Sequence, residues 1–146
     1  MPLLNYTTSI DAAKTIGELS AILARHGAQF ITVGYDAQRN PSGIAFVFPV
    51  NGTPCNFKLP TQIDGVLKVM RADRKVPRSK CTPEQAARVG WRIVKDWVAA
   101  QMAFIEAGQS RMEQVFLPYA LLNDGTTLFD AVTRSPLLLS AGPPRA

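Results

Sequence analysis

The sequence predicts an α+β fold in which an antiparallel sheet of three to four strands is packed on one face by helices, including one long amphipathic C-terminal helix. The clearest observation is a helical pattern over residues 82–108 with an identifiable start, end and apolar face. Alternating apolar residues indicate strands between residues 29 and 59, and apolar residues at helical spacing precede them over 12–26. This order of elements favours helices on one face of an antiparallel sheet.

The N-terminal region is predicted to contain a short strand and a helix. Residues 5–9 have strand-like composition, and Asp11 can cap a helix over 12–26 that Gly27 ends in a left-handed conformation. His26 lies in the last turn of this helix. We expect it to interact with helix carbonyls, and the alternative is a functional proton carrier.

Three strands are predicted next, over residues 29–35, 44–50 and 55–59. Asn51 and Gly52 are typical of a tight hairpin turn between the second and third strands. The alternation predicts an antiparallel meander with one face in contact with water. The apolar residues of its buried face are Ile44, Phe46, Phe48, Cys55, Phe57 and Leu59.

Capping signals define the two helices that follow. Thr61 can begin a helix with an apolar stripe that reaches Met70, after which a linker is expected. Thr82 suits the N-cap of the long helix, where Gln85 is placed to complete a capping box, and Gly108 suits its end. Both helices are therefore predicted from local signals.

Periodicity places Trp97 at the centre of the buried face of the long helix and Trp91 at its edge. Gln101 interrupts this face. Since an unpaired buried amide costs roughly 1–3 kcal/mol, we expect it to have a structural hydrogen bond, a subunit contact or a ligand contact. The other residues predicted on this face are Ala86, Gly90, Ile93, Val94, Phe104 and Ile105.

The C-terminal region is predicted to be short and irregular. Pro118 ends a short helix, and residues 119–132 favour a hairpin or a strand followed by a short helix. Residues 1–132 are predicted to form a single domain. Residues 133–146 lack periodicity and are expected to be a flexible tail or to dock on a partner through three leucines. These are Leu137, Leu138 and Leu139.

The net charge of +5 is concentrated in one place, residues 68–80, which we call the basic segment. Six basic side chains there face one acidic side chain, Asp73, whereas the rest of the chain holds ten basic and ten acidic residues. The segment is therefore the first candidate for contact with an anionic partner. Its basic residues are Lys68, Arg71, Arg74, Lys75, Arg78 and Lys80.

The basic segment could bind nucleic acid or nucleotide phosphate with little sequence preference. Arg88 and Arg92 could extend it along the long helix, or could pair with Glu84 and Asp96. The alternative is a solvated linker without a binding role.

Two aromatic residues could stack on bases beside a basic surface. Trp91 and Tyr35 are the candidates, with core packing as the alternative.

Several function classes lack a signal in the sequence. We find no catalytic motif, phosphate-binding loop or paired carboxylates, so we expect a protein that is not an enzyme and needs no cofactor. One histidine and two separated cysteines, Cys55 and Cys81, make a metal site unexpected and leave a disulfide open. Without a signal peptide or an apolar run of membrane-spanning length, we expect a cytoplasmic protein that does not bind membranes.

Four parts of the chain resemble small hypothetical proteins of bacteriophages, prophages and related bacterial mobile elements. They are residues 6–8, 26–28, 88–101 and 115–119, and the resemblance extends over about residues 5 to 130. It implies a phage setting, with the host cytoplasm as location, and no site residues.

The leading hypothesis is a non-enzymatic phage-type accessory protein that binds nucleic acid, single strands in preference to duplex, through the basic segment. A second is an anti-defence protein that sequesters a nucleotide or inhibits a host protein. A third is a structural or host-interaction protein. A homo-oligomer is expected, with an interface at the exposed sheet edge or the C-terminal segment.

Overall fold

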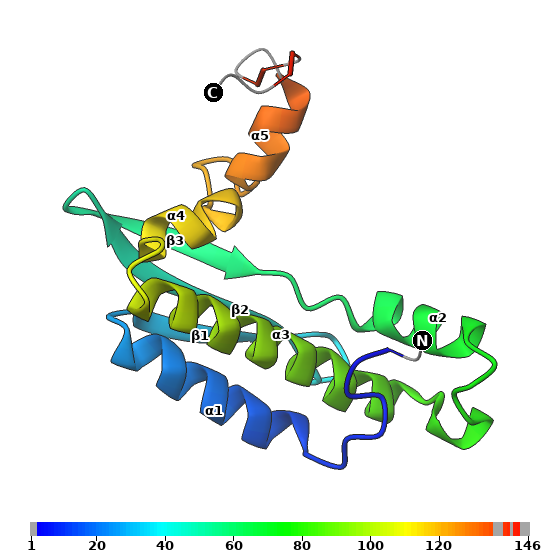
Figure 1. Cartoon of the computed structure of the whole chain (residues 1–146). Coiled ribbons are helices and arrows are strands. Elements are labelled where there is room, and N and C mark those ends of the chain that lie inside the picture. Colours follow the sequence, from blue (N-terminus) through cyan, green and yellow to red (C-terminus); the bar gives the residue numbers. More distant parts are fainter. Residues whose placement is uncertain (1–2, 136–138, 141, 144–146) are drawn as a thin grey trace.

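The computed structural model describes residues 3–135, 139–140 and 142–143, and in this part the fold is α+β, as predicted. A three-stranded antiparallel sheet and five α-helices form the described structure (Figure 1). The elements are α1 (Ala12–Arg25), β1 (Gln29–Tyr35), β2 (Pro41–Val50), β3 (Thr53–Leu59), α2 (Ile63–Ala72), η1 (Arg78–Lys80), α3 (Pro83–Glu106), α4 (Met112–Phe116), η2 (Leu117–Tyr119) and α5 (Leu128–Arg134).

The sheet is the predicted meander, with strand order β1-β2-β3. Asn51 and Gly52 both have positive φ, 51° and 84°, which is the backbone of a tight hairpin turn. The hairpin register places Phe46 opposite Phe57, and their rings stack with centroids 5.5 Å apart. The local turn signal therefore determined the register of β2 and β3.

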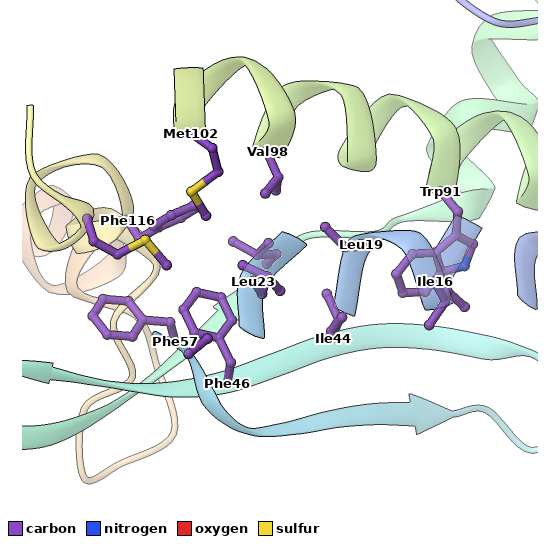
Figure 2. Close-up of a cluster of buried hydrophobic side chains, with 13 residues drawn as sticks. Ile16, Leu19, Leu23, Ile44, Phe46, Phe57, Trp91, Val98, Met102 and Phe116 are labelled. Carbon is purple, nitrogen blue, oxygen red and sulfur yellow. The ribbon is translucent and has the colours of Figure 1, made fainter. Parts of the chain in front are cut away.

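The main core lies between one face of the sheet and the layer of helices that covers it (Figure 1). Trp91, Val98 and Met102 point from α3 toward the strands (Figure 2). Phe116 of α4 closes one end of this core, with its ring edge against Phe46 at a centroid distance of 5.6 Å. Leu19 and Leu23 of α1 complete it and are fully buried.

A second, smaller apolar cluster joins α2 to the N-terminal half of α3. Gly90 of α3 lies at this contact, and a Cβ atom there would be only 2.8 Å from Cδ1 of Ile63. The close approach of the two helices therefore requires glycine at this position. The buried members of the cluster are Leu67, Met70, Val76, Ala86 and Val89.

The predicted strand at residues 5–9 is wrong. This segment forms a turn in which Asn5 has a φ of 67°. Its backbone carbonyls at Tyr6 and Thr8 accept hydrogen bonds from the side-chain amide of Gln85, at 3.0 and 2.8 Å. The Gln85 Oε1 atom accepts from Arg88 Nη1 at 3.2 Å and not from the Thr82 backbone. The capping box predicted for α3 is therefore only half formed, with Thr82 Oγ1 accepting from the Gln85 backbone N–H.

The long helix is present, but its buried face is rotated from the predicted one. Trp91 is fully buried rather than at the edge, Trp97 is half-buried, and Phe104 is 49% exposed. The reason is that α3 contributes to two cores: Ala86 and Val89 pack in the cluster with α2, whereas Trp91, Val98 and Met102 pack in the main core, so no single stripe faces one core. Gln101 is only half-buried, and the buried glutamine of this helix is Gln85.

The long helix is also not C-terminal, and a fourth strand is not shown. Helices α4 and α5 follow it. Ala120 forms one isolated antiparallel bridge with Phe57 of β3, and the chain then turns away into α5. Since Pro118 interrupts this region just before the bridge, a longer ladder on β3 does not form.

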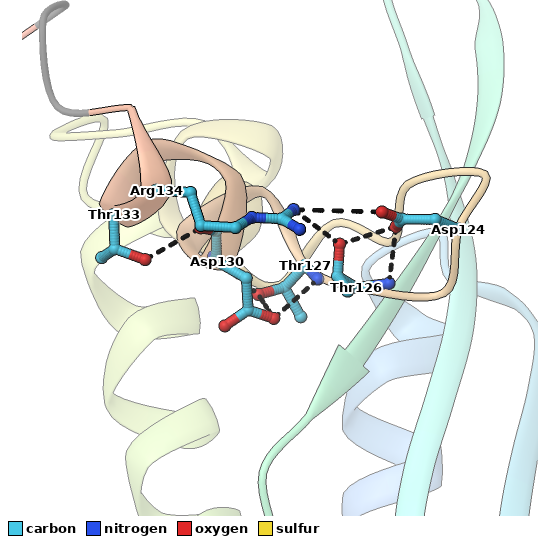
Figure 3. Close-up of polar contacts among 6 residues, drawn as sticks. All are labelled: Asp124, Thr126, Thr127, Asp130, Thr133 and Arg134. Carbon is cyan, nitrogen blue, oxygen red and sulfur yellow. Dashed lines mark hydrogen bonds and ion pairs between the residues drawn. The ribbon is translucent and has the colours of Figure 1, made fainter.

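Helix α5 reaches two residues past the predicted domain end at residue 132. Thr127 and Asp130 form its capping box, and Arg134 reaches back to Thr126 and Asp124 (Figure 3). The hydrogen bonds from Thr126 hold the pKa of Asp124 below its usual range, and those from Thr127 do the same for the pKa of Asp130. Half of the predicted tail, including Leu137 and Leu138, lies outside the described residues.

Candidate nucleic-acid interface

The basic segment connects α2 to α3, at the end of the molecule opposite α5 (Figure 1). Lys68 and Arg71 lie on α2, Arg74 and Lys75 in the following turn, and Arg78 and Lys80 in η1. All are exposed except Lys80, which is half-buried. Lys68 and Arg71 are three residues apart and therefore lie on the same side of the helix.

One buried residue and several local hydrogen bonds hold this segment in place. Val76 is buried in the cluster between α2 and α3. The carboxylate of Asp73 accepts a hydrogen bond from the backbone of Lys75 at 2.9 Å, and the Pro77 carbonyl accepts one from the backbone of Lys80 at 2.9 Å. The cations are therefore carried on a structured loop with its own apolar anchor.

The six cations of the basic segment form no ion pair with any carboxylate in the described part of the chain. Its only acidic residue, Asp73, uses its side chain for the backbone of Lys75. Outside the segment, five described cations do form ion pairs. These are Arg88, Arg92, Lys95, Arg111 and Arg134.

Arg88 and Arg92 join α3 to α1 instead of extending the basic segment. Arg92 Nη1 lies 2.6 Å from Oε2 of Glu18 and donates to Thr15, and its side chain is only 16% exposed. Arg88 Nε lies 3.5 Å from Oδ1 of Asp11. The predicted partners within α3, Glu84 and Asp96, are therefore wrong, because acidic residues of a neighbouring helix lie closer. 

Asp96 itself contacts the N-terminal segment and its helix neighbour. Its Oδ2 accepts from the side chain of Asn5 at 2.8 Å, and its Oδ1 lies 3.8 Å from Nζ of Lys95. The acidic residue predicted to neutralise Arg92 thus holds the N-terminal turn against α3.

The two stacking candidates differ in accessibility. Trp91 is fully buried, so its ring offers no free face to a base, and this prediction is wrong. Its indole N–H has no hydrogen-bond partner among the described residues. Tyr35 is 64% exposed at the end of β1, so its ring remains accessible.

A cavity of about 730 Å³ lies beside the first turns of α2 and α3 and the loop between β1 and β2. Asp36, Asp64 and Glu84 line it, with Lys58 as the one cationic residue. Carboxylates therefore outnumber cations in this cavity, which disfavours a phosphate-bearing ligand there.

The residues that could carry catalysis are dispersed or engaged. His26 Nδ1 contacts the Ile22 carbonyl at 2.8 Å, which confirms the predicted contact with the helix, and Nε2 lies 2.8 Å from Oε1 of Glu106. Cys55 and Cys81 are both free thiols. Within the described residues, no group of three or more histidine, cysteine or acidic side chains is arranged to hold a metal ion.

No helix in the described ranges combines the length and the apolar character needed to cross a bilayer. No protein-family model matches the chain, and the searches of curated proteins and of solved structures gave no significant match. The resemblance to small phage proteins therefore stays a prediction.

Proposed function

We propose that this protein binds nucleic acid through the basic segment, as a non-enzymatic accessory protein of the phage type. The contacts are with phosphates, because lysine and arginine side chains on a loop and a helix end can approach a backbone but present no helix to a base edge. Single strands are favoured over duplex because a flexible strand can follow an irregular loop.

The observation that supports this proposal is the contrast in ion pairing. All six cations of the basic segment are without a carboxylate partner among the described residues, whereas Arg88 and Arg92 are paired with α1. A cation that is already paired must lose its partner before it can bind a phosphate, and an exposed unpaired one releases only counterions and water. Four other exposed cations, Lys14, Arg25, Arg39 and Lys58, are also unpaired in the described structure, but they are spread over α1, the β1–β2 loop and β3. Unpaired positive charge is therefore concentrated in the basic segment.

A salt-dependent binding experiment tests the proposal. The probe is a fluorescein-labelled 20-nucleotide single strand of mixed sequence, and its anisotropy is measured between 50 and 300 mM salt. With about four phosphates contacted, log K should fall with log salt at a slope of about −3. The variant R71E/R74E/K75E/R78E should lose at least about 100-fold in affinity and keep its melting temperature, since these side chains are exposed and form no ion pair in the described structure.

The chain offers a control with the same change in net charge. K14E/R25E/R39E/K58E alters four exposed cations outside the basic segment that form no ion pair in the described structure. This control should lose far less affinity than the first variant. Equal losses in the two variants, or no binding of single-stranded DNA, single-stranded RNA and duplex by the unaltered protein, would contradict the proposal.

A further inference from the structure

The two edges of the sheet are not equivalent. At the β3 edge, Leu121 donates its backbone N–H to the carbonyl of Asn56 at 2.8 Å, beside the bridge of Ala120 to Phe57. β1 pairs only with β2, and its other edge has no strand partner in the described part of the chain. The β1 edge is thus the open side of the sheet.

β1 lacks the side chains that usually protect an open edge. Its sequence, Gln29–Tyr35, contains no charged residue and no proline. By contrast, β3 contains both Pro54 and Lys58. A strand that carries no charge can pair with an identical strand without repulsion between like charges.

Near the start of β1, an exposed phenylalanine has a strained backbone conformation. The ladder with β2 shifts register between Gln29 and Thr32, which is a β-bulge. Phe30 lies within it with a φ of 48°, a conformation that bulky residues rarely adopt, and its side chain is 79% exposed. Such strain without any packing gain in the isolated chain points to a contact made with another molecule.

Helix α1 has an unusual face beside this edge. Thr15 and Glu18 contact Arg92, which defines the side of α1 that faces α3. At 100° per residue, the opposite side carries small side chains at spacings of four, three and four residues. These are Ala13, Gly17, Ser20 and Ala24, and none is fully buried.

The small residues permit a close approach of a second helix. A Cβ atom at Gly17 would meet nothing within 4 Å, so the space in front of the stripe is open. Lys14 and Arg25 of α1 lie away from the stripe at this helical spacing. The stripe is therefore uncharged, like β1.

We infer that a second copy of this chain binds here, with β1 antiparallel to β1 and α1 against α1 across a twofold axis. The sheet then continues as six strands, with the helices of both copies on the same face. One seven-residue strand alone would bury less than the roughly 1,600 Å² typical of stable interfaces. The dimer therefore needs the small-residue face of α1 in addition to the open edge of β1.

The basic segments stay free in this dimer, because they connect α2 and α3 and do not belong to α1 or β1. Two copies of the basic segment would then bind one nucleic-acid strand more tightly than a single copy does. The dimer itself does not depend on the proposed nucleic-acid binding, so the two proposals fail separately.

The mass in solution of the full chain tests the inference. Light scattering after size exclusion, at 5 to 200 μM protein without nucleic acid, should give twice the chain mass of 15.9 kDa. Gly17→Arg should raise the dissociation constant of the dimer at least tenfold. It should not unfold the chain, because arginine favours a helix more than glycine does and the added side chain has open space.

Two further variants make the result specific. Gly65→Arg adds the same side chain at an open glycine of α2 and should leave the dimer intact. Phe30→Asp should also produce a monomer, because aspartate tolerates positive φ but places like charges at the interface, whereas Phe129→Asp on α5 should not. A monomeric unaltered protein at 200 μM, or a dimer that survives both Gly17→Arg and Phe30→Asp, would overturn the inference.

Discussion

Cations are ion-paired at the contact between α1 and α3 and unpaired in the basic segment between α2 and α3. At the helix contact, Arg88 and Arg92 reach Asp11 and Glu18 of the neighbouring helix. In the basic segment, which includes the end of α2, six cations have no such partner in the described structure. The Arg92 side chain is only 16% exposed, so its charge is partly desolvated and the ion pair with Glu18 offsets that cost, whereas the exposed cations of the basic segment stay solvated and available. Position in the packing therefore separates structural cations from candidate binding cations.

The largest effect is expected in the packed region, at Trp91. Trp91→Ala should lower the free energy of unfolding by about 3–5 kcal/mol, because it empties a fully buried site between α3 and the sheet. Phe104→Ala on the same helix is the control and should change it by less than about 1 kcal/mol. Urea unfolding of both variants gives the two free energies. A larger loss of stability for Phe104→Ala would mean that the buried face of α3 is the one predicted from periodicity.

The next effect tests how α2 supports the loop. Gly90→Val should cost about 2–3 kcal/mol, because its side chain would overlap Ile63 and Val66 of α2. Gly65→Val, at an open position of α2, should cost much less. Thermal unfolding measures both. A stable Gly90→Val protein would show that α2 is not held tightly against α3.

A pair of length-matched substitutions compares the two kinds of cation directly. Arg92→Met should lower the free energy of unfolding by about 1–2 kcal/mol, because it leaves the partly buried Glu18 without its cation. Arg78→Met should leave stability within about 0.5 kcal/mol and weaken nucleic-acid binding instead. In chemical unfolding Arg92→Met should be the less stable protein, and in the anisotropy assay Arg78→Met should be the weaker binder. If one variant is the more impaired in both assays, the comparison is contradicted.

The smallest effect concerns pH and α5. Hydrogen bonds from Thr126 and Thr127 lower the pKa values of Asp124 and Asp130 from their ordinary value of 3.8. A lowered pKa in the folded state means that the stabilisation is present above pH 3.8 and is lost as the pH falls through the folded pKa. Helix α5 should therefore fray in acid before the main core unfolds.

Carbon chemical shifts of α5 measured between pH 7 and 2 test this prediction, with α1 as the internal reference. Thr127→Val should raise the pH at which α5 frays, because it removes the side-chain hydrogen bond to Asp130. If the helical chemical shifts of α1 and α5 are lost at the same pH, the two helices do not differ in acid stability and the prediction is wrong.

Local signals account for much of the fold. The turn at Asn51 and Gly52, the left-handed glycines Gly27 and Gly108 and the N-cap at Thr82 all appear where predicted, because each depends on residues close in sequence. The segment at 5–9 was mispredicted because composition does not say what the backbone will bind, and here the Tyr6 and Thr8 carbonyls accept hydrogen bonds from the distant Gln85 side chain instead of a strand.

Charge counts were enough to locate the candidate interface, but not to decide which neighbouring residues belong to it. The excess charge of the basic segment is a property of composition and needs no structure. The exclusion of Trp91, Arg88 and Arg92 needed contacts across the fold, since the two arginines pair with Asp11 and Glu18 and Trp91 packs in the main core. A helical wheel describes one cylinder, and α3 faces several neighbours along its length.

By itself the sequence determined the class of fold, the hairpin, the ends of the long helix and the place where positive charge collects, because these follow from turn chemistry, capping and composition. Tertiary structure alone decided which tryptophan is buried, which arginines are neutralised and which edge of the sheet is open. The physical reason is that burial and ion pairing depend on atoms brought together from distant parts of the chain, as with Arg92 and Glu18.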